Sequence, residues 1–258
     1  MELAGKVALI TGGGRGAGRA IALAFARQGA AVAVIARTPA AIDAVAAEVQ
    51  ALDRRGIAVP CDVTDQGQVA AAVAAVREHL GPLDILVNSA GMGASAKTTE
   101  MDDALWERVL RLNLTAPYYC MKAVLPDMIA RRWGRIINVA STSSKIPYLY
   151  TAAYTASKHG LLGLTRAVAL EMNRYNITVN AIGPSFMATE FAYDSARNIA
   201  ARTGCSFDEA VATLGRMSPQ NRLIEPAEVA HVALMLAADA AKGITGQCLQ
   251  VDGGTVMS

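Results

Sequence analysis

A tyrosine and a lysine stand four residues apart in the stretch YTASK, at Tyr154 and Lys158. Residues at this spacing share one face of a helix, so a phenol and an ammonium would lie side by side. An ammonium roughly 5 Å away favours the phenolate by about 3 kcal/mol at an effective dielectric constant near 20, which would lower the phenol pKa by roughly two. The pair is therefore a candidate for proton transfer near neutral pH. The alternative is a tyrosine packed beside a snorkelling lysine.

A glycine-rich loop, TGGGRGAG at 11–18, follows a short apolar run and opens a helical pattern. Glycines let the backbone turn tightly and approach a pyrophosphate, and the helix N-terminus supplies unpaired N–H groups and a favourable dipole. Such a loop alone is a weak signal, because ordinary strand–helix turns also contain glycine. Its place between a strand and a helix predicts a dinucleotide site.

The end of the second apolar run indicates which dinucleotide is bound. An acidic residue there would bind the ribose 2′-hydroxyl of NAD(H), but the sequence has Ala36 followed by Arg37. Arg37 could pair with a 2′-phosphate, with Arg15 as a second contact. We therefore expect NADP(H), with NAD(H) possible if both arginines are merely solvated.

Composition narrows the class of protein further. The chain has 258 residues, 53% of them hydrophobic, with 24 basic and 22 acidic residues. A net charge of +2 argues against nucleic acid or an anionic membrane as the main partner. The start lacks the pattern of a secretory leader, and no apolar run reaches membrane-spanning length. Four dispersed cysteines indicate reduced thiols in a cytoplasmic protein, and three scattered histidines predict no metal site.

Apolar runs alternate with helical patterns along the chain, which predicts an α/β fold with a doubly wound parallel sheet in one domain, 1–258. The expected strands cover 6–11, 30–36, 57–61, 83–88, 134–140, 177–182 and 248–251. The expected helices cover 16–28, 39–54, 66–79, 102–131, 152–174 and 226–238.

Residues 185–222 interrupt this alternation. A structureless stretch of that length is unusual in a compact domain, and SARNIAAR and FDEAVATL have helical patterns. The segment leaves the carboxyl end of a strand, where ligands of open α/β sheets bind. We expect a small helical substrate lid; the alternative is a surface excursion without a role.

The motifs TGGGRGAG, NSAG (88–91), NLTAPYY (113–119), YTASK and DGG (252–254), in this order, resemble those of the short-chain dehydrogenase/reductase family over essentially the whole chain. The resemblance implies a Rossmann-like domain with a seven-stranded parallel sheet, commonly a tetramer. It also implies a catalytic tetrad of Asn113, Ser141, Tyr154 and Lys158. Ser141 would donate to the substrate carbonyl oxygen, Lys158 would hold the nicotinamide ribose, and Asn113 would hold a water that links Lys158 to solvent.

The same resemblance implies a set of cofactor-binding residues. Ser89 replaces the family's second asparagine, which we expect to affect structure little. Ser185 replaces a glycine at the entry to the lid. Because serine lacks the freedom of glycine at positive φ, we expect that the chain could enter the lid along a different path. The implied set is Thr11, Gly12, Arg15, Gly16, Ala17, Gly18, Arg37, Asp62, Val63, Asn88, Ala90, Gly91, Tyr154, Lys158, Pro184 and Thr189.

The expected pocket is mostly apolar or hydroxylic, which suits an uncharged ketone. Its lining is expected from 92–96, 142–144, Ile146, 148–150, Phe186, Met187 and Phe191, with Lys145 the nearest cation. The alternative is that these side chains only pack the lid onto the rest of the domain. Arg131, Arg132 and Arg174 could converge at the mouth and dock an acyl carrier protein with a 3-oxoacyl-thioester, or be ordinary helix-end cations.

These observations predict an NADP(H)-dependent carbonyl reductase that acts on an uncharged ketone or a 3-oxoacyl-thioester. An NAD-dependent secondary alcohol dehydrogenase is the enzymatic alternative. A non-catalytic dinucleotide-binding protein is the alternative from another class. The apolar faces of helices 102–131 and 152–174 favour a homo-oligomer, a dimer or a tetramer.

Overall fold

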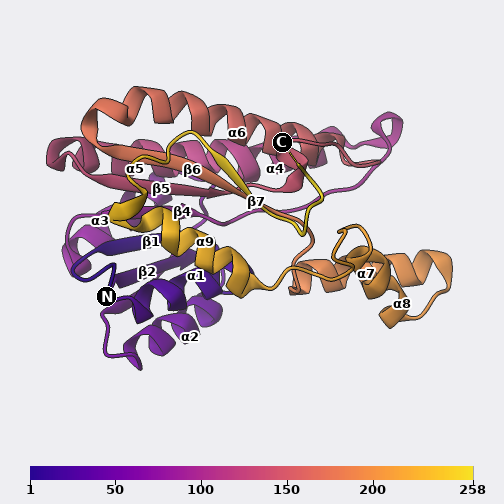
Figure 1. The fold of residues 1–258 in the computed structure, drawn as a ribbon, viewed down its shortest axis with the longest axis horizontal. Helices are drawn as coiled ribbons and strands as arrows, with labels where there is room; N and C mark the ends of the chain where they lie inside the picture. Colours follow the sequence, from indigo (N-terminus) through magenta and orange to yellow (C-terminus); the bar gives the residue numbers. More distant parts are fainter. Residues whose placement is uncertain (258) are drawn as a thin grey trace.

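The computed structural model describes residues 1–257, and one sheet of seven strands runs through it (Figure 1). Neighbouring strands are all parallel, in the order β3-β2-β1-β4-β5-β6-β7. The strands are β1 (Val7–Thr11), β2 (Ala31–Ala36), β3 (Gly56–Pro60), β4 (Ile85–Asn88), β5 (Gly134–Val139), β6 (Ile177–Pro184) and β7 (Cys248–Val251). The predicted doubly wound parallel sheet is therefore confirmed.

Helices cover both faces of this sheet. One face carries α1 (Gly16–Arg27), α2 (Pro39–Gln50) and α9 (Pro226–Ala237), which share one apolar core with the strands. The other face carries α3 (Gln66–Leu80), α5 (Ala116–Arg131) and α6 (Ala152–Met172), which enclose a second core. Continuous burial along β1, β4, β5 and β6 follows from this double cover and explains their mostly apolar sequences.

The strand order reverses direction between β1 and β4. From β1 the chain moves outward to β2 and β3, and then returns to place β4 on the other side of β1. The loops after β1 and β4 therefore diverge, and the crevice between them is the usual ligand site of open α/β sheets. In register, Thr11 lies opposite Asn88, and Asn88 lies opposite Asn138.

The expected helix 102–131 is interrupted by a wider turn. It consists of α4 (Asp103–Leu110), a π-helical segment (Arg111–Thr115) and α5. A π turn accommodates an additional residue in the helix, and such turns occur frequently at functional sites. Here the π turn contains Asn113.

The 185–222 segment folds into α7 (Glu190–Thr203) and α8 (Phe207–Gly215), so both predicted helices are confirmed. A small apolar cluster of their own, which includes Ala192, Ala196 and Leu214, holds them together. Figure 1 shows the pair standing to one side of the sheet. A single β-bridge between Met187 and Ile224 closes the base of this lid segment.

Two local expectations concern residue chemistry. Ser185 follows β6, donates its backbone N–H to the Val251 carbonyl (3.2 Å) and is not among the positive-φ residues, so serine is accepted there without strain. All four cysteines are free thiols, with Cys61 and Cys120 buried. Within residues 1–257, no helix has the length and apolarity to cross a membrane.

Candidate active site

Tyr154 and Lys158 lie on the first two turns of α6, as their spacing predicts. The Lys158 Nζ is 5.7 Å from the centre of the Tyr154 ring. The lysine is 5% exposed, and its ammonium donates to the carbonyl of Val139 (2.9 Å) at the carboxyl end of β5. The alternative of a snorkelling surface lysine is therefore wrong, because the charged end of Lys158 faces the interior.

The sequence predicts that the Lys158 ammonium lowers the pKa of Tyr154, and the structure corrects this prediction. Burial raises the pKa of Tyr154, a hydrogen bond with the Ser141 side chain lowers it by less, and the neighbouring Tyr148 raises it further. Burial also lowers the pKa of Lys158 from 10.5 to about 8. Desolvation disfavours the charged form of each group. In this structure, Tyr154 is therefore a protonated phenol at neutral pH.

Ser141 follows β5 and lies beside the Tyr154 phenol. It is the N-cap of a short 3-10 turn (Thr142–Ser144), and its Oγ accepts from the Ser143 backbone N–H (3.1 Å). The Ser144 hydroxyl donates to the Ser141 carbonyl (2.6 Å), which fixes the backbone from the other side. One bond to its hydroxyl and one to its backbone carbonyl thus hold Ser141 in place next to Tyr154.

Asn113 ties the loop after β4 to α6. Its Oδ1 accepts from the Met92 backbone N–H (2.9 Å), and its Nδ2 donates to the Met92 carbonyl (2.8 Å) and to the Ser157 hydroxyl (3.1 Å). Ser157 in turn donates to the Tyr154 carbonyl (2.7 Å). The side chain therefore positions neighbouring parts of the site, and the predicted water-holding role stays a prediction.

The glycine loop forms a cradle into which a side chain would not fit. Gly12 has a φ of +63°, and a Cβ on it would lie 2.9 Å from the Ala90 backbone. A Cβ on Gly18 would lie 2.4 Å from the Gly12 carbonyl oxygen, so α1 packs closely on the loop. No acidic residue occupies the first turn of α1, whose N-terminus is open to an anion. This backbone arrangement fits the pyrophosphate of a dinucleotide.

Thr11 joins this cradle to the loop after β4. Its Oγ1 accepts the backbone N–H groups of Ser89 and Ala90, both at 3.0 Å. These bonds involve the backbone of Ser89 and not its side chain. Asn88 donates to Asn138 Oδ1 (2.8 Å), while its own Oδ1 is buried without a protein partner.

The remaining predicted cofactor residues close the same edge of the sheet. A Cβ on Gly91 would lie 3.2 Å from Asn113 Oδ1 and 3.8 Å from Lys158 Nζ. A Cβ on Gly16 would lie 3.4 Å from the Thr189 methyl group, so the glycine loop faces the N-cap of α7. Pro184 ends β6, and Ala17 and Val63 are buried. The structure thus brings the predicted set together, and the cofactor roles of its members stay predictions.

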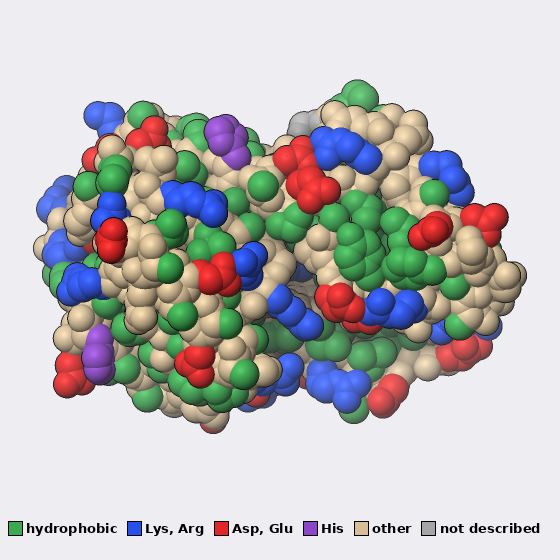
Figure 2. All heavy atoms as spheres, turned by 90° about the horizontal axis from the view of Figure 1, so that it is seen from below, with side chains coloured by type: hydrophobic (Ala, Val, Ile, Leu, Met, Phe, Trp, Pro, Cys, Tyr) green, Lys and Arg blue, Asp and Glu red, His purple; other side chains and the backbone are tan. Residues whose placement is uncertain are grey.

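Two exposed arginines flank the outer end of this crevice. Arg15 and Arg37 are exposed, and neither forms an ion pair within the described residues. Arg37 lies near Asp62, since its charge helps to lower the pKa of that carboxyl, after the larger effect of the Thr64 backbone hydrogen bond. Figure 2 shows a hollow between the two lobes of the molecule with Lys and Arg side chains beside it.

The 185–222 segment and the loop after β4 are in contact. A Cβ on Gly93 would lie 2.3 Å from the end of the Phe191 ring, so the ring rests directly on this glycine. Ala96 donates its N–H to the Tyr150 carbonyl (2.8 Å), which joins two of the predicted lining segments. The charge of Lys145 lowers the pKa of Cys248, although burial of that thiol raises it by more, so Lys145 lies toward β7.

The arginines proposed for carrier docking lie elsewhere. Arg131 pairs with Asp84 (2.6 Å), which directly precedes β4, and Arg132 donates to the Arg174 carbonyl (2.9 Å), which precedes β6. The three residues therefore converge at the amino edge of the sheet. Tyr154 belongs to the carboxyl edge, about 20 Å away along a six-residue strand. The expectation that they lie beside the mouth of the site within one chain is wrong.

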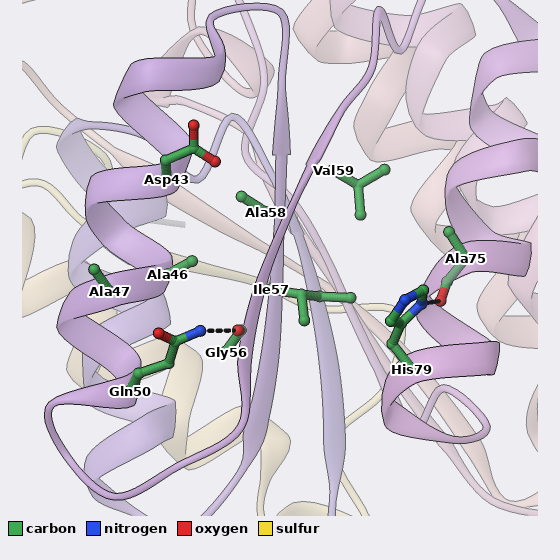
Figure 3. Close-up of a pocket in the computed structure, with 10 residues that line it drawn as sticks. All are labelled: Asp43, Ala46, Ala47, Gln50, Gly56, Ile57, Ala58, Val59, Ala75 and His79. Atoms are coloured by element: carbon green, nitrogen blue, oxygen red, sulfur yellow. Dashed lines mark hydrogen bonds between the residues drawn. The ribbon is translucent and has the colours of Figure 1, made fainter.

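A separate groove of about 380 Å³ runs along the outer edge of β3 between α2 and α3 (Figure 3). Asp43 and His79 stand on its two walls, and Gln50 donates to the Gly56 carbonyl (2.8 Å). None of the predicted site residues lines it. The Gln50 side chain occupies a hydrogen-bonding group on the exposed edge of β3. At this groove the edge of the sheet is therefore partly protected from pairing with another strand.

Several residues that shape the site were missed by sequence reasoning. Asn138 supports Asn88 and donates to Thr165 on α6 (2.9 Å), while Ser157 links Asn113 to Tyr154. A signal existed for Asn138, because a polar residue inside the apolar run GRIINVA requires a buried partner. Ser157 carried no such signal, since its spacing to Asn113 depends on the π turn.

The fold and these side chains define a dinucleotide-binding oxidoreductase site at the carboxyl edge of a doubly wound sheet. Residues 6–200 match the family model described as short chain dehydrogenase. The chain belongs to this family.

Individual relatives extend the similarity over the whole chain. An oxidoreductase, YxjF, of Bacillus subtilis is 37% identical over 96% of this chain and 97% of its own. A 3-oxoacyl-acyl-carrier-protein reductase of Pseudomonas aeruginosa is 38% identical over the full length of both chains. Among solved structures, an actinorhodin polyketide ketoreductase with NADPH matches with a TM-score of 0.94 and 36% identity, over 97% of each chain.

Proposed function

We propose that this protein is an NADP(H)-dependent ketoreductase that reduces an uncharged ketone or a 3-oxoacyl-thioester to a secondary alcohol. The observation that carries this proposal is the protonated Tyr154 phenol beside the Ser141 hydroxyl and the buried Lys158 ammonium. Two neighbouring hydroxyl groups, with a cation 5.7 Å from the centre of the Tyr154 ring, suit a carbonyl oxygen that gains negative charge.

Each side chain has a distinct task in this mechanism. When bound, the nicotinamide supplies the hydride for the carbonyl carbon. Ser141 donates a hydrogen bond to the carbonyl oxygen, and Tyr154 gives that oxygen its proton. Lys158 then stabilises the phenolate left on Tyr154 and binds the nicotinamide ribose. A phenol with a raised pKa carries its proton at neutral pH, which is the form that reduction requires.

NADP(H) is the proposed cofactor because of the charge at the outer end of the crevice. No carboxylate directly follows β2, where Ala36 is followed by Arg37. An exposed arginine suits a 2′-phosphate, with which it can form two charge-assisted hydrogen bonds. The solved ketoreductase structure with NADPH supports the same choice.

The proposed substrate follows from the lining of the pocket and from the relatives. Phe191, Tyr148 and Met187 are apolar or hydroxylic. The charge of Lys145 lowers the pKa of Cys248 on β7, although burial raises that pKa by more. A pocket of this kind accepts neutral carbonyl compounds. Relatives named as 3-oxoacyl and polyketide ketoreductases support a ketone of the acyl or polyketide class.

Consumption of NADPH by a set of ketones tests this function. The purified protein is mixed with NADPH and with acetoacetyl-N-acetylcysteamine, ethyl acetoacetate or cyclohexanone, and the loss of NADPH absorbance is followed. We expect turnover of at least one of them, and a decrease of at least about 100-fold in Tyr154→Phe, because general acid catalysis is lost.

Tyr175→Phe is the matched control, because it removes the same hydroxyl from a tyrosine just before β6, at the amino edge of the sheet. It should retain wild-type turnover. Near-normal turnover in Tyr154→Phe would contradict the assigned proton donor. Absence of NADPH oxidation with every ketone in the folded wild-type protein would contradict the reductase function itself.

A further inference from the structure

A row of three buried polar side chains crosses the sheet near the carboxyl ends of its central strands. Thr11 on β1 lies opposite Asn88 on β4, and Asn88 lies opposite Asn138 on β5. Residues directly opposite each other in a sheet point to the same face, so the three side chains lie on one face. Because they are buried among apolar residues, they require hydrogen-bond partners inside the protein.

The row continues onto α6 at Thr165, which is fully buried. Asn88 donates to Asn138 Oδ1 (2.8 Å), and Asn138 donates to Thr165 Oγ1 (2.9 Å). Thr165 in turn donates to the carbonyl of Leu161 on its own helix (2.7 Å). Three consecutive hydrogen bonds therefore lead from β4, across β5, to the helix that carries Tyr154.

The other end of the row belongs to the proposed cofactor site. Thr11 begins the glycine loop, and its Oγ1 accepts the backbone N–H groups of Ser89 and Ala90 (both 3.0 Å). Asn88 directly precedes these two residues. A Cβ on Gly12 would lie 2.9 Å from the Ala90 backbone, so this stretch also packs against the glycine loop. The row thus joins α6 to the loops that would hold the cofactor.

The helix α6 is bound to β5 at two points that lie two helical turns apart, about 10.5 Å along its axis. Lys158 donates to the Val139 carbonyl (2.9 Å), and seven residues later Thr165 accepts from Asn138. The flexible four-carbon stem of lysine lets the first bond follow a shift of the helix. The second bond is stiffer, because threonine is branched at Cβ and its Oγ1 is also bonded to Leu161. A shift of α6 would break it and leave a buried amide unpaired.

We propose that Thr165 is a positioning residue of the active site, which through Asn138 and Asn88 fixes the place of α6, and with it Lys158, relative to the cofactor loops. This inference rests on the proposed function, in which Lys158 binds the nicotinamide ribose. Thr165 lies two turns beyond Lys158 and is fully buried, so it acts on the cofactor only through the position of the helix.

Thr165→Val tests this role, because valine has nearly the same shape and no acceptor. Binding of NADPH is followed by the fluorescence of the bound cofactor, well below the temperature of unfolding. We expect the Kd to rise roughly three- to tenfold, the effect of one lost hydrogen bond. Thr165→Ser keeps the hydroxyl and should stay within about twofold of the wild-type Kd. Thr178→Val makes the same change at a buried threonine of β6 outside the row and should leave the Kd unchanged.

Hydrogen exchange of the cofactor-free protein separates this inference from the proposed function, because it requires neither NADPH nor a ketone. In Thr165→Val, the amide protons of residues 155–160 should exchange at least about threefold faster than in the wild type, and in Thr178→Val they should not. Thr165→Cys, whose sulfur is a weak acceptor, replaces Thr165→Val if the valine variant does not fold, with the same changes expected.

Two results would overturn the positioning role. One is an unchanged Kd in Thr165→Val when the wild-type protein binds NADPH. The other is faster exchange confined to the helical turn around residue 165, or wild-type exchange along the whole of α6. A wild-type protein that binds no NADPH would contradict the proposed function and leave the exchange experiment to decide the role of Thr165.

Discussion

The two ionisable groups of the site respond in opposite directions to the same burial. Loss of water raises the pKa of the Tyr154 phenol and lowers the pKa of the Lys158 ammonium to about 8. Lys158 is consequently protonated below about pH 8 and loses its proton as the pH rises through that value. Near neutrality the site holds a neutral acid beside a cation. This combination can donate a proton and then stabilise the resulting anion.

Arg37 carries the residue-scale prediction for cofactor preference. Arg37→Asp removes a partner for the 2′-phosphate and supplies an acceptor for a 2′-hydroxyl. We expect the ratio of kcat/KM for NADPH to that for NADH to fall at least about tenfold, the loss of one hydrogen bond to a charged group. Steady-state kinetics with both cofactors at one fixed ketone concentration measure this ratio.

The control for Arg37 is Arg27→Asp, which makes the same charge change at an exposed position in the last turn of α1. It should leave the ratio unchanged, because Arg27 lies at the end of the helix away from the glycine loop. A ratio that stays constant in Arg37→Asp would refute the role of this arginine.

Among the elements, the 185–222 segment contacts the rest of the site at two glycines. Gly16 faces Thr189, and Gly93 lies under the ring of Phe191. At Gly93 the contact requires the absence of a side chain on the glycine. Phe191 remains 51% exposed although it touches Gly93, so one side of its ring is available to the pocket.

Gly93→Ala tests whether Phe191 forms a wall of the pocket. The new methyl group would lie 2.3 Å from the ring, so Phe191 must rotate away. A loss of about 1 kcal/mol of apolar contact would raise KM for a ketone roughly fivefold. In a Phe191→Ala background, adding Gly93→Ala should change KM less than about twofold, because the clash no longer exists.

Gly243→Ala serves as the control for the glycine substitution, since no atom lies within 4 Å of the place that its new methyl group would occupy. It should leave KM unchanged. If Gly93→Ala raises KM equally with and without the Phe191 ring, the ring is not the cause and the proposed wall is wrong.

The strands and most helices could be predicted from the sequence because their burial is uniform. β1 and β5 lie between two layers of helices, so nearly every residue is apolar or paired, and the apolar runs are continuous. The π turn at Asn113 was not predictable, because one inserted residue hardly changes the periodicity of an amphipathic helix. The Tyr154–Lys158 contact followed from helical spacing alone.

Other properties of the site depend on tertiary structure. The pKa of Tyr154 depends on how deeply α6 packs against β5, which the spacing of two residues does not determine. The position of Arg131 depends on Asp84, whose carboxylate is distant in the sequence and holds it at the amino edge. In both cases the effect of a charge depends on where the folded chain places it, which helical spacing and helix ends do not reveal.

At the scale of the whole molecule, the outer face of α5 and α6 has features of a subunit interface. His159, Gly163, Arg166 and Leu170 follow one another at helical spacing along α6, and Leu170 is 79% exposed. Tyr118 on the adjacent α5 is 44% exposed. Pairing with the same face of a second copy would remove Leu170 from water. We therefore propose that this face pairs two copies of the chain in a homo-oligomer.

Leu170→Glu tests this pairing. In a twofold interface each substitution acts twice, and burying one leucine contributes about 1.5–3 kcal/mol, so self-association should weaken at least about 100-fold. Light scattering after size-exclusion chromatography should show a smaller particle than the wild-type oligomer. Leu149→Glu makes the same change at an 83% exposed leucine in the loop before α6 and should keep the wild-type mass. Equal masses for Leu170→Glu and wild type would show that α6 does not hold the subunits together.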